Sequence, residues 1–189
     1  MHRFVATALI ALLFAPLAQA EGRIFSVVPS SSSVTYKLVH KFHEIEGVTK
    51  SLEGKGLVQP DGVIKVQVRA KIESFDSGNG NRDAHMKETV EAARFPDVEF
   101  KGVASGVKPV TAFPAKNKIY FKGTLTFHGV SLPQTVELEV AQADAEHVSA
   151  EGSFPISLES FKVERPQLLF VPVDDQVVIH LKLALDAAK

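Results

Sequence analysis

The chain has 189 residues, no cysteine, and 21 basic against 22 acidic side chains, for a formal net charge of −1. The absence of cysteine excludes disulfides, thiol catalysis and thiolate metal sites, and the balanced charge gives no sign of the basic surface that nucleic-acid binding needs. The length suffices for one domain with a substantial core but is short for two.

The first 20 residues have the pattern of a secretory signal peptide. Arg3 supplies a positive charge, Phe4 to Leu17 form an apolar run, and Ala18-Gln19-Ala20 is a small-x-small cleavage site. The apolar run is short for a membrane span of about 20 residues. We therefore expect cleavage after Ala20 and export of one soluble domain over residues 21–189.

Alternating apolar and polar residues predict a series of half-buried β-strands. The clearest run is Ile64 to Ile72, which follows a predicted turn at Pro60-Asp61-Gly62. About eight or nine such strands, joined mostly by short turns, favour an all-β antiparallel sheet. Closure into a barrel would remove the exposed sheet edges, although a β-sandwich is the alternative because it also buries one face of each strand.

The alternation breaks only between Ser74 and Phe100. Glycine and asparagine residues predict a loop, after which Asn79 or Asn81 can cap a helix near residues 81–93. Pro96 disfavours helical angles at the preceding residue and so is expected to end the helix. One helix face would carry Met86, Val90 and Ala93.

Three motifs occur in order along the chain. They are Val34-x-Tyr36-x-Leu38-x-His40, then Ser74-Phe75-Asp76-Ser77-Gly78-Asn79 with Arg82-Asp83-x-His85-Met86 and Phe95-Pro96, and then Gly123-x-Leu125-Thr126-x-His128-Gly129-Val130 with Pro133. Together they resemble the signature of the YceI-like polyisoprenoid-binding family over essentially the whole chain after the leader. The resemblance implies a periplasmic protein with an extended, lipocalin-like barrel of about eight strands, whose cavity takes a long isoprenoid or similar amphiphilic chain.

The inward-facing apolar residues are the candidates for the wall of such a cavity. A long apolar chain buried there would gain roughly 25 cal/mol per Å² of apolar surface, without polar contacts. The alternative is a core filled by these same side chains. The expected lining residues are Tyr36, Leu38, Val66, Val68, Phe100, Phe121, Leu125, Phe127 and Phe154.

Polar residues near the start of the helix are the candidates for a polar rim around the head group. Arg82 and His85 could meet an anionic or carbonyl head group, with help from the partial positive charge of the helix amino terminus. Asp83 and His40 are the other tentative rim residues. In the alternative, Arg82 and Asp83 pair as a structural cap and His85 tethers the helix to the barrel.

The remaining histidines and acidic residues favour structural roles, and we expect no metal site. His43 would point away from His40 on a continuous strand, so the two make a poor metal pair unless the chain turns between them. His128 precedes Gly129 in a turn, and the Asp174-Asp175 carboxylates are typical of a turn.

The sequence thus predicts a binding or carrier protein rather than an enzyme, with a polyisoprenoid or isoprenoid-quinone-like lipid as its ligand and no required cofactor. Two other kinds of partner are possible. One is a membrane or membrane enzyme, contacted transiently, and the other is a second copy of the chain in a homodimer. One alternative is a module that delivers to, or stabilises, a membrane redox enzyme. Another is a hydrolase that uses Ser77, Asp83 and His85, although no G-x-S-x-G or HExxH motif supports it. Enlarging Gly123 to Phe is expected to lower lipid binding with little loss of fold.

Overall fold

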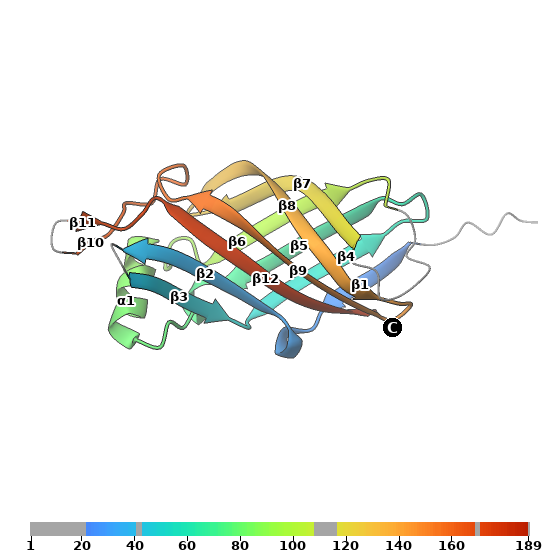
Figure 1. Cartoon of the computed structure of the whole chain (residues 1–189), viewed down its shortest axis with the longest axis horizontal. Coiled ribbons are helices and arrows are strands. Elements are labelled where there is room, and N and C mark those ends of the chain that lie inside the picture. Colours follow the sequence, from blue (N-terminus) through green and yellow to red (C-terminus); the bar gives the residue numbers. More distant parts are fainter. Residues whose placement is uncertain (1–21, 41–42, 108–116, 169–170, 189) are drawn as a thin grey trace, which may run out of the picture.

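The alternating strands close into one antiparallel β-barrel (Figure 1). The structure, a computed structural model, describes residues 22–40, 43–107, 117–168 and 171–188, so the expected signal peptide lies outside the described residues. The strands are β1 (Arg23–Val27), β2 (Ser33–His40), β3 (His43–Thr49), β4 (Leu52–Val58), β5 (Ile64–Lys71), β6 (Asp97–Ala104), β7 (Asn117–Phe127), β8 (Val130–Ala143), β9 (His147–Ser157), β10 (Gln167–Leu168), β11 (Val171–Pro172) and β12 (Gln176–Ala187).

The barrel closes through β12, which pairs with β9 on one edge and with both β1 and β2 on the other. The short 3-10 helix η1 (Pro29–Ser31) separates β1 from β2, so these two strands share one position in the barrel. Their partners β4 and β3 share the next position. Ten strands therefore form eight barrel positions, which confirms the predicted barrel and excludes the sandwich.

Each strand sends alternate side chains into the barrel. On β5, Val66, Val68 and Ala70 point inward, while Lys65 and Arg69 are exposed. The largest cluster of buried apolar residues draws on β6 to β9 and β12, and includes Phe121, Leu125, Phe154 and Leu183.

The interruption between β5 and β6 contains the short 3-10 helix η2 (Ile72–Ser74) and the helix α1 (Gly80–Thr89), which lies at one end of the barrel (Figure 1). Asn79 is the N-cap, and its side chain accepts a hydrogen bond from the backbone amide of Arg82 at 3.1 Å. The predicted cap is thus confirmed. None of the helices in the described part of the chain has the length and apolar character that a bilayer crossing requires.

The helix ends earlier than the predicted limit at residue 93. Glu91 adopts a left-handed backbone with φ of 48°, and its amide donates to the carbonyl of Glu88 while that of Ala92 donates to Lys87. These bonds form a Schellman motif, which closes the helix well before Pro96. As a result Ala92 is buried and Ala93 is exposed, contrary to the face expected from an unbroken helix.

A close approach of two strands corrects the interpretation of Gly123. It lies opposite Gly102 across β6 and β7, and a Cβ atom there would overlap the backbone of Lys101 and Gly102. Gly123 is not among the residues that line the interior cavity. The expectation that Phe at this position would leave the fold intact is therefore wrong, because the strands leave no space for any side chain.

Candidate binding cavity

The barrel encloses a cavity of about 1630 Å³ that extends from the α1 end to the opposite end, at the turn between β4 and β5. This volume exceeds the roughly 300–1,000 Å³ of ordinary ligand pockets, so the core is not filled by side chains. All nine residues expected at the wall line the cavity. Whether they contact a ligand stays a prediction.

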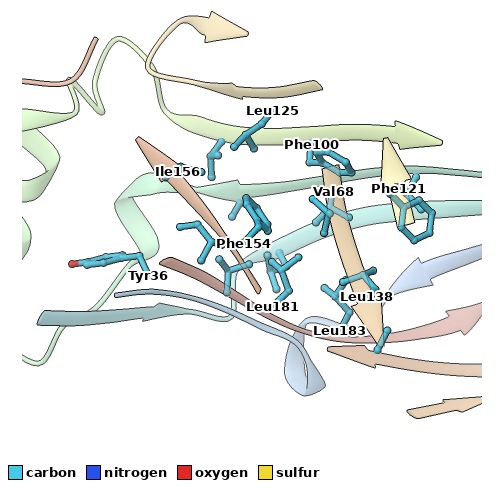
Figure 2. A pocket seen from close by; sticks show the side chains of 18 of the residues that line it. Tyr36, Val68, Phe100, Phe121, Leu125, Leu138, Phe154, Ile156, Leu181 and Leu183 are labelled. Atoms are coloured by element: carbon cyan, nitrogen blue, oxygen red, sulfur yellow. The ribbon is translucent and has the colours of Figure 1, made fainter. Parts of the chain in front are cut away.

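The wall is built mainly from aromatic and aliphatic side chains on different strands (Figure 2). Phe100 on β6, Phe121 on β7 and Phe154 on β9 enclose the cavity together with aliphatic residues. Sequence reasoning did not select Leu138, Ile156, Leu181 and Leu183, which line it as well. All four lie on the alternating strands β8, β9 and β12, so the alternation itself could have identified them.

Polar lining residues lie toward the two ends of the cavity. At the α1 end they include His40, Asn79, Arg82 and His85. At the opposite end they include Arg23, Gln59, Asp61 and Asp144. An apolar interior with polar ends suits an elongated molecule that has a long apolar part and a polar group.

Tyr36 places a phenol on this wall near α1. Its ring lies over Gly47, where a Cβ atom would come within 2.6 Å of the phenol oxygen, and packs against Phe75 with ring centroids 5.5 Å apart. Burial, and secondly the charge of Asp83, raise the pKa of Tyr36, so the phenol stays protonated and can donate. The hydroxyl makes no hydrogen bond within the described chain, and in Figure 2 it points away from the other labelled residues.

Asp83 and Arg82 meet on Ser77 rather than on each other. The buried Asp83 carboxylate accepts hydrogen bonds from the Ser77 amide, at 3.1 Å, and from its hydroxyl. Arg82 Nε donates to the Ser77 hydroxyl at 2.8 Å, and its guanidinium also donates to the Ser77 carbonyl. Asp83 does not line the cavity, so the structure supports its capping role, whereas Arg82 both holds the loop and reaches the cavity wall.

The arrangement of Ser77, Asp83 and His85 is not that of a catalytic triad. The Ser77 hydroxyl binds directly to Asp83, and in the described chain no hydrogen bond joins the exposed His85 to either residue. A triad requires the histidine between the nucleophile and the carboxylate. The geometry therefore gives the hydrolase alternative no support.

His40, a tentative rim residue, is buried and hydrogen-bonded within the protein. Its Nε2 atom lies 3.1 Å from the carbonyl oxygen of Val171. The chain turns after His40, so His43 is its direct cross-strand partner, and the expectation of opposite faces on one strand does not apply. Within the described ranges, no three histidine or acidic side chains come together as a metal site would require.

His128 has the structural role that was predicted for it. Its Nδ1 atom lies 3.0 Å from the carbonyl oxygen of Phe161, and its ring packs edge-on against Phe95. Its Nε2 atom is 3.4 Å from a carboxylate oxygen of Glu91, at the end of α1. The residue thereby joins the β7–β8 turn to two neighbouring segments.

Asp175 acts as a turn carboxylate, again as expected. It accepts a hydrogen bond from the backbone amide of Glu159 at 2.8 Å, and this bond lowers the pKa of the carboxyl.

A closed antiparallel barrel around an apolar cavity with polar ends defines a class of binding proteins for hydrophobic small molecules. Comparison with known proteins gives the family, because residues 25–185 match the model of the YceI-like domain. The chain belongs to the YceI-like family.

Individual relatives and structural neighbours have low sequence identity to this chain. The UPF0312 protein VPA0850 of Vibrio parahaemolyticus is 27% identical over 144 residues, which cover 73% of each chain. BcnA of Burkholderia cenocepacia has a TM-score of 0.70 at 24% identity, covering 84% of this chain and 98% of its own. A structure described as a polyisoprenoid binding domain from Saccharophagus degradans also scores 0.70, at 15% identity, covering 87% and 98%.

Proposed function

We propose that this protein is exported to the periplasm, where it carries or sequesters a polyisoprenoid or isoprenoid-quinone-like lipid in the barrel cavity. The observation that carries the proposal is the cavity of about 1630 Å³, with an apolar wall and polar ends. The Saccharophagus degradans neighbour, described as a polyisoprenoid binding domain, supports the choice of ligand class. The export pattern of residues 1–20 supports the location.

In this proposal the apolar chain of the ligand lies along the inner faces of the strands. Its transfer from water gains roughly 25 cal/mol per Å² of apolar surface, so a chain of several isoprene units binds without polar contacts. The head group lies at the α1 end, where the protonated Tyr36 hydroxyl can donate to a carbonyl or hydroxyl oxygen. Arg82 and His85 border the same part of the cavity.

Native mass spectrometry of the exported protein, followed by organic extraction and lipid identification, tests this function. We expect the native mass to show a bound lipid in stoichiometric amount, and the organic extract to contain an isoprenoid lipid. A protein without extractable lipid that also fails to take up added isoprenoid quinone would contradict the proposal. It would favour the module that serves a membrane redox enzyme.

A pair of matched variants locates the ligand in the barrel. Val66 lines the cavity, and its neighbour on the adjacent strand is Gly56, where even an added Cβ atom would make only ordinary contacts. The larger side chain of Val66→Phe should therefore extend from the wall and fill part of the cavity. Val178 is partly exposed on the outside of β12, and Val178→Phe adds the same volume there. Only the first variant should reduce lipid occupancy, and equal occupancy in both would place the ligand outside the barrel.

A further inference from the structure

The outer wall of the barrel carries a band of lysines and exposed apolar side chains. Strand register places two adjacent cross-strand rows on the outside of β1 and β4 to β7. The first row is Ile24, Leu57, Lys65, Val103 and Lys122, and the second is Ser26, Lys55, Gln67, Lys101 and Thr124. We call these two rows, together with the neighbouring Tyr120, the outer lysine patch.

The outer lysine patch is a local concentration of positive charge. It contains four lysines and no carboxylate, although the whole chain has a formal charge of −1. Lys101 pairs with Glu99, just outside the patch, at 2.8 Å. Among the described residues, no ion pair engages Lys55, Lys65 or Lys122, so their charge is available to an external partner.

The same patch holds the most exposed large apolar side chains of the described chain. Ile24 is 47% exposed, Val103 44% and Tyr120 53%, more than the two other exposed valines, Val39 and Val178. These three side chains stand singly among the lysines rather than forming one apolar groove. Such a mixture of cationic and apolar groups matches the surface of an anionic bilayer, which attracts lysines and accepts apolar side chains at its interface.

The patch adjoins the cavity mouth that lies opposite α1. The strands that carry it lead into the β4–β5 turn, at Gln59 to Gly62, and into Gly106 and Val107, all of which line the cavity. A membrane held against the patch would thus lie beside this end of the cavity.

We propose that the outer lysine patch docks the protein on an anionic lipid bilayer and brings this mouth to the membrane surface, where lipid enters or leaves. The entry of lipid rests on the proposed function, whereas the docking itself does not. The lysines of the patch supply a long-range electrostatic attraction that is weakened by salt. Ile24, Val103 and Tyr120 supply short-range apolar contact with the membrane interface.

Co-sedimentation with vesicles tests the docking. The wild-type protein should bind vesicles that contain phosphatidylglycerol, release them at high salt, and bind poorly to vesicles of phosphatidylcholine alone. The variant Lys65→Glu/Lys122→Glu should bind the anionic vesicles at least about tenfold more weakly. The control Lys50→Glu/Lys182→Glu changes the net charge equally at exposed lysines elsewhere and should keep most of the binding.

A second pair of variants tests the apolar contacts at constant charge. Ile24→Thr/Val103→Thr should weaken binding to the anionic vesicles roughly threefold or more, because two apolar groups no longer enter the interface. Val39→Thr/Val178→Thr removes exposed valine side chains elsewhere on the barrel wall and should have no such effect.

Several outcomes would overturn the docking. One is the absence of wild-type binding to anionic vesicles, and another is an equal loss in the patch variant and its charge control. A concentration-dependent dimer that Val103→Thr abolishes, without vesicle binding, would assign the patch to a second copy of the chain. Native mass spectrometry separates the two proposals, because a protein that docks but contains no isoprenoid would defeat only the proposed function.

Discussion

Gly102 and Gly123 are cross-strand partners on β6 and β7, at a point where the two backbones come into direct contact. A Cβ atom on Gly123 would lie 2.6 Å from the Cα atom of Gly102 and would overlap the carbonyl oxygen of Lys101. A Cβ atom on Gly102 would lie 2.6 Å from the ring of Phe100, which covers this residue. Gly123 therefore allows β6 and β7 to approach closely, and Gly102 leaves room for the Phe100 ring.

We expect Gly123→Ala to destabilise the protein, because even one methyl group has no space there. The free energy of unfolding should fall by about 1–3 kcal/mol, the usual cost of overpacking. Urea denaturation followed by circular dichroism measures this loss. Gly56→Ala is the control, since a Cβ atom at Gly56 has its nearest neighbour at an ordinary 3.8 Å. Equal stability of the two variants would show that the strands separate easily at Gly123.

The strands and their inward faces could be predicted from the sequence, because burial of one face imposes a period of two on residues such as Val66, Val68 and Ala70. Closure could not be predicted in this way, because a sandwich buries the same faces. The division of one barrel position between β1 and β2 also depends on how both strands meet β12.

Helix α1 and the contact between Ser77 and Asp83 could be predicted only in part from the local sequence. Asn79 is a standard cap, but Glu91 gives no sign of a left-handed turn, which usually falls on glycine. The bond between Ser77 and Asp83 depends on how the loop folds back on α1. The sequence left Asp83 two roles, a rim residue or a cap paired with Arg82, and the structure shows its carboxylate holding the loop through Ser77.

Replacement of Asp83 should show how much this loop anchor contributes. Asp83→Ala leaves the Ser77 amide and hydroxyl without their buried carboxylate acceptor, so we expect a loss of about 1–3 kcal/mol in the free energy of unfolding. Glu88→Ala is the matched control, because Glu88 is exposed on the same helix. Chemical denaturation of both variants measures the difference, and equal midpoints would show that the anchor does not stabilise the fold.

His147 and Asp186 should make the stability depend on pH. Their side chains form a hydrogen bond of 2.9 Å between β9 and β12, and this bond raises the pKa of His147 above its ordinary value of 6.5. Because the folded pKa is the higher one, the stabilisation is present below the unfolded pKa and is lost as pH rises through the folded pKa. The effect is small, since both side chains are exposed.

Nuclear magnetic resonance titration of the imidazole signal measures this shift. Asp186→Asn should lower the pKa of His147 toward its ordinary value, whereas Asp174→Asn, which removes an exposed carboxylate elsewhere, should leave it unchanged. An unchanged pKa in Asp186→Asn would mean that the hydrogen bond does not form in solution.

Tyr36 offers the sharpest test of where the head group lies. Tyr36 lines the cavity, its hydroxyl has no hydrogen-bond partner in the described chain, and its raised pKa keeps the phenol a neutral donor. Tyr36→Phe keeps the ring against Phe75 and removes only this donor, so affinity for a soluble isoprenoid quinone should fall roughly three- to tenfold, as expected for one lost hydrogen bond.

The chain has one other tyrosine, Tyr120, which is exposed on the outside of the barrel and provides the matched control. Fluorescence or calorimetric titration of Tyr36→Phe and Tyr120→Phe with the same quinone compares the two hydroxyls. The control should retain wild-type affinity, because Tyr120 does not line the cavity. Wild-type affinity in Tyr36→Phe, with lipid still in the barrel, would place the head group at the opposite mouth, beside Arg23 and Gln59, and reverse the orientation proposed for the ligand.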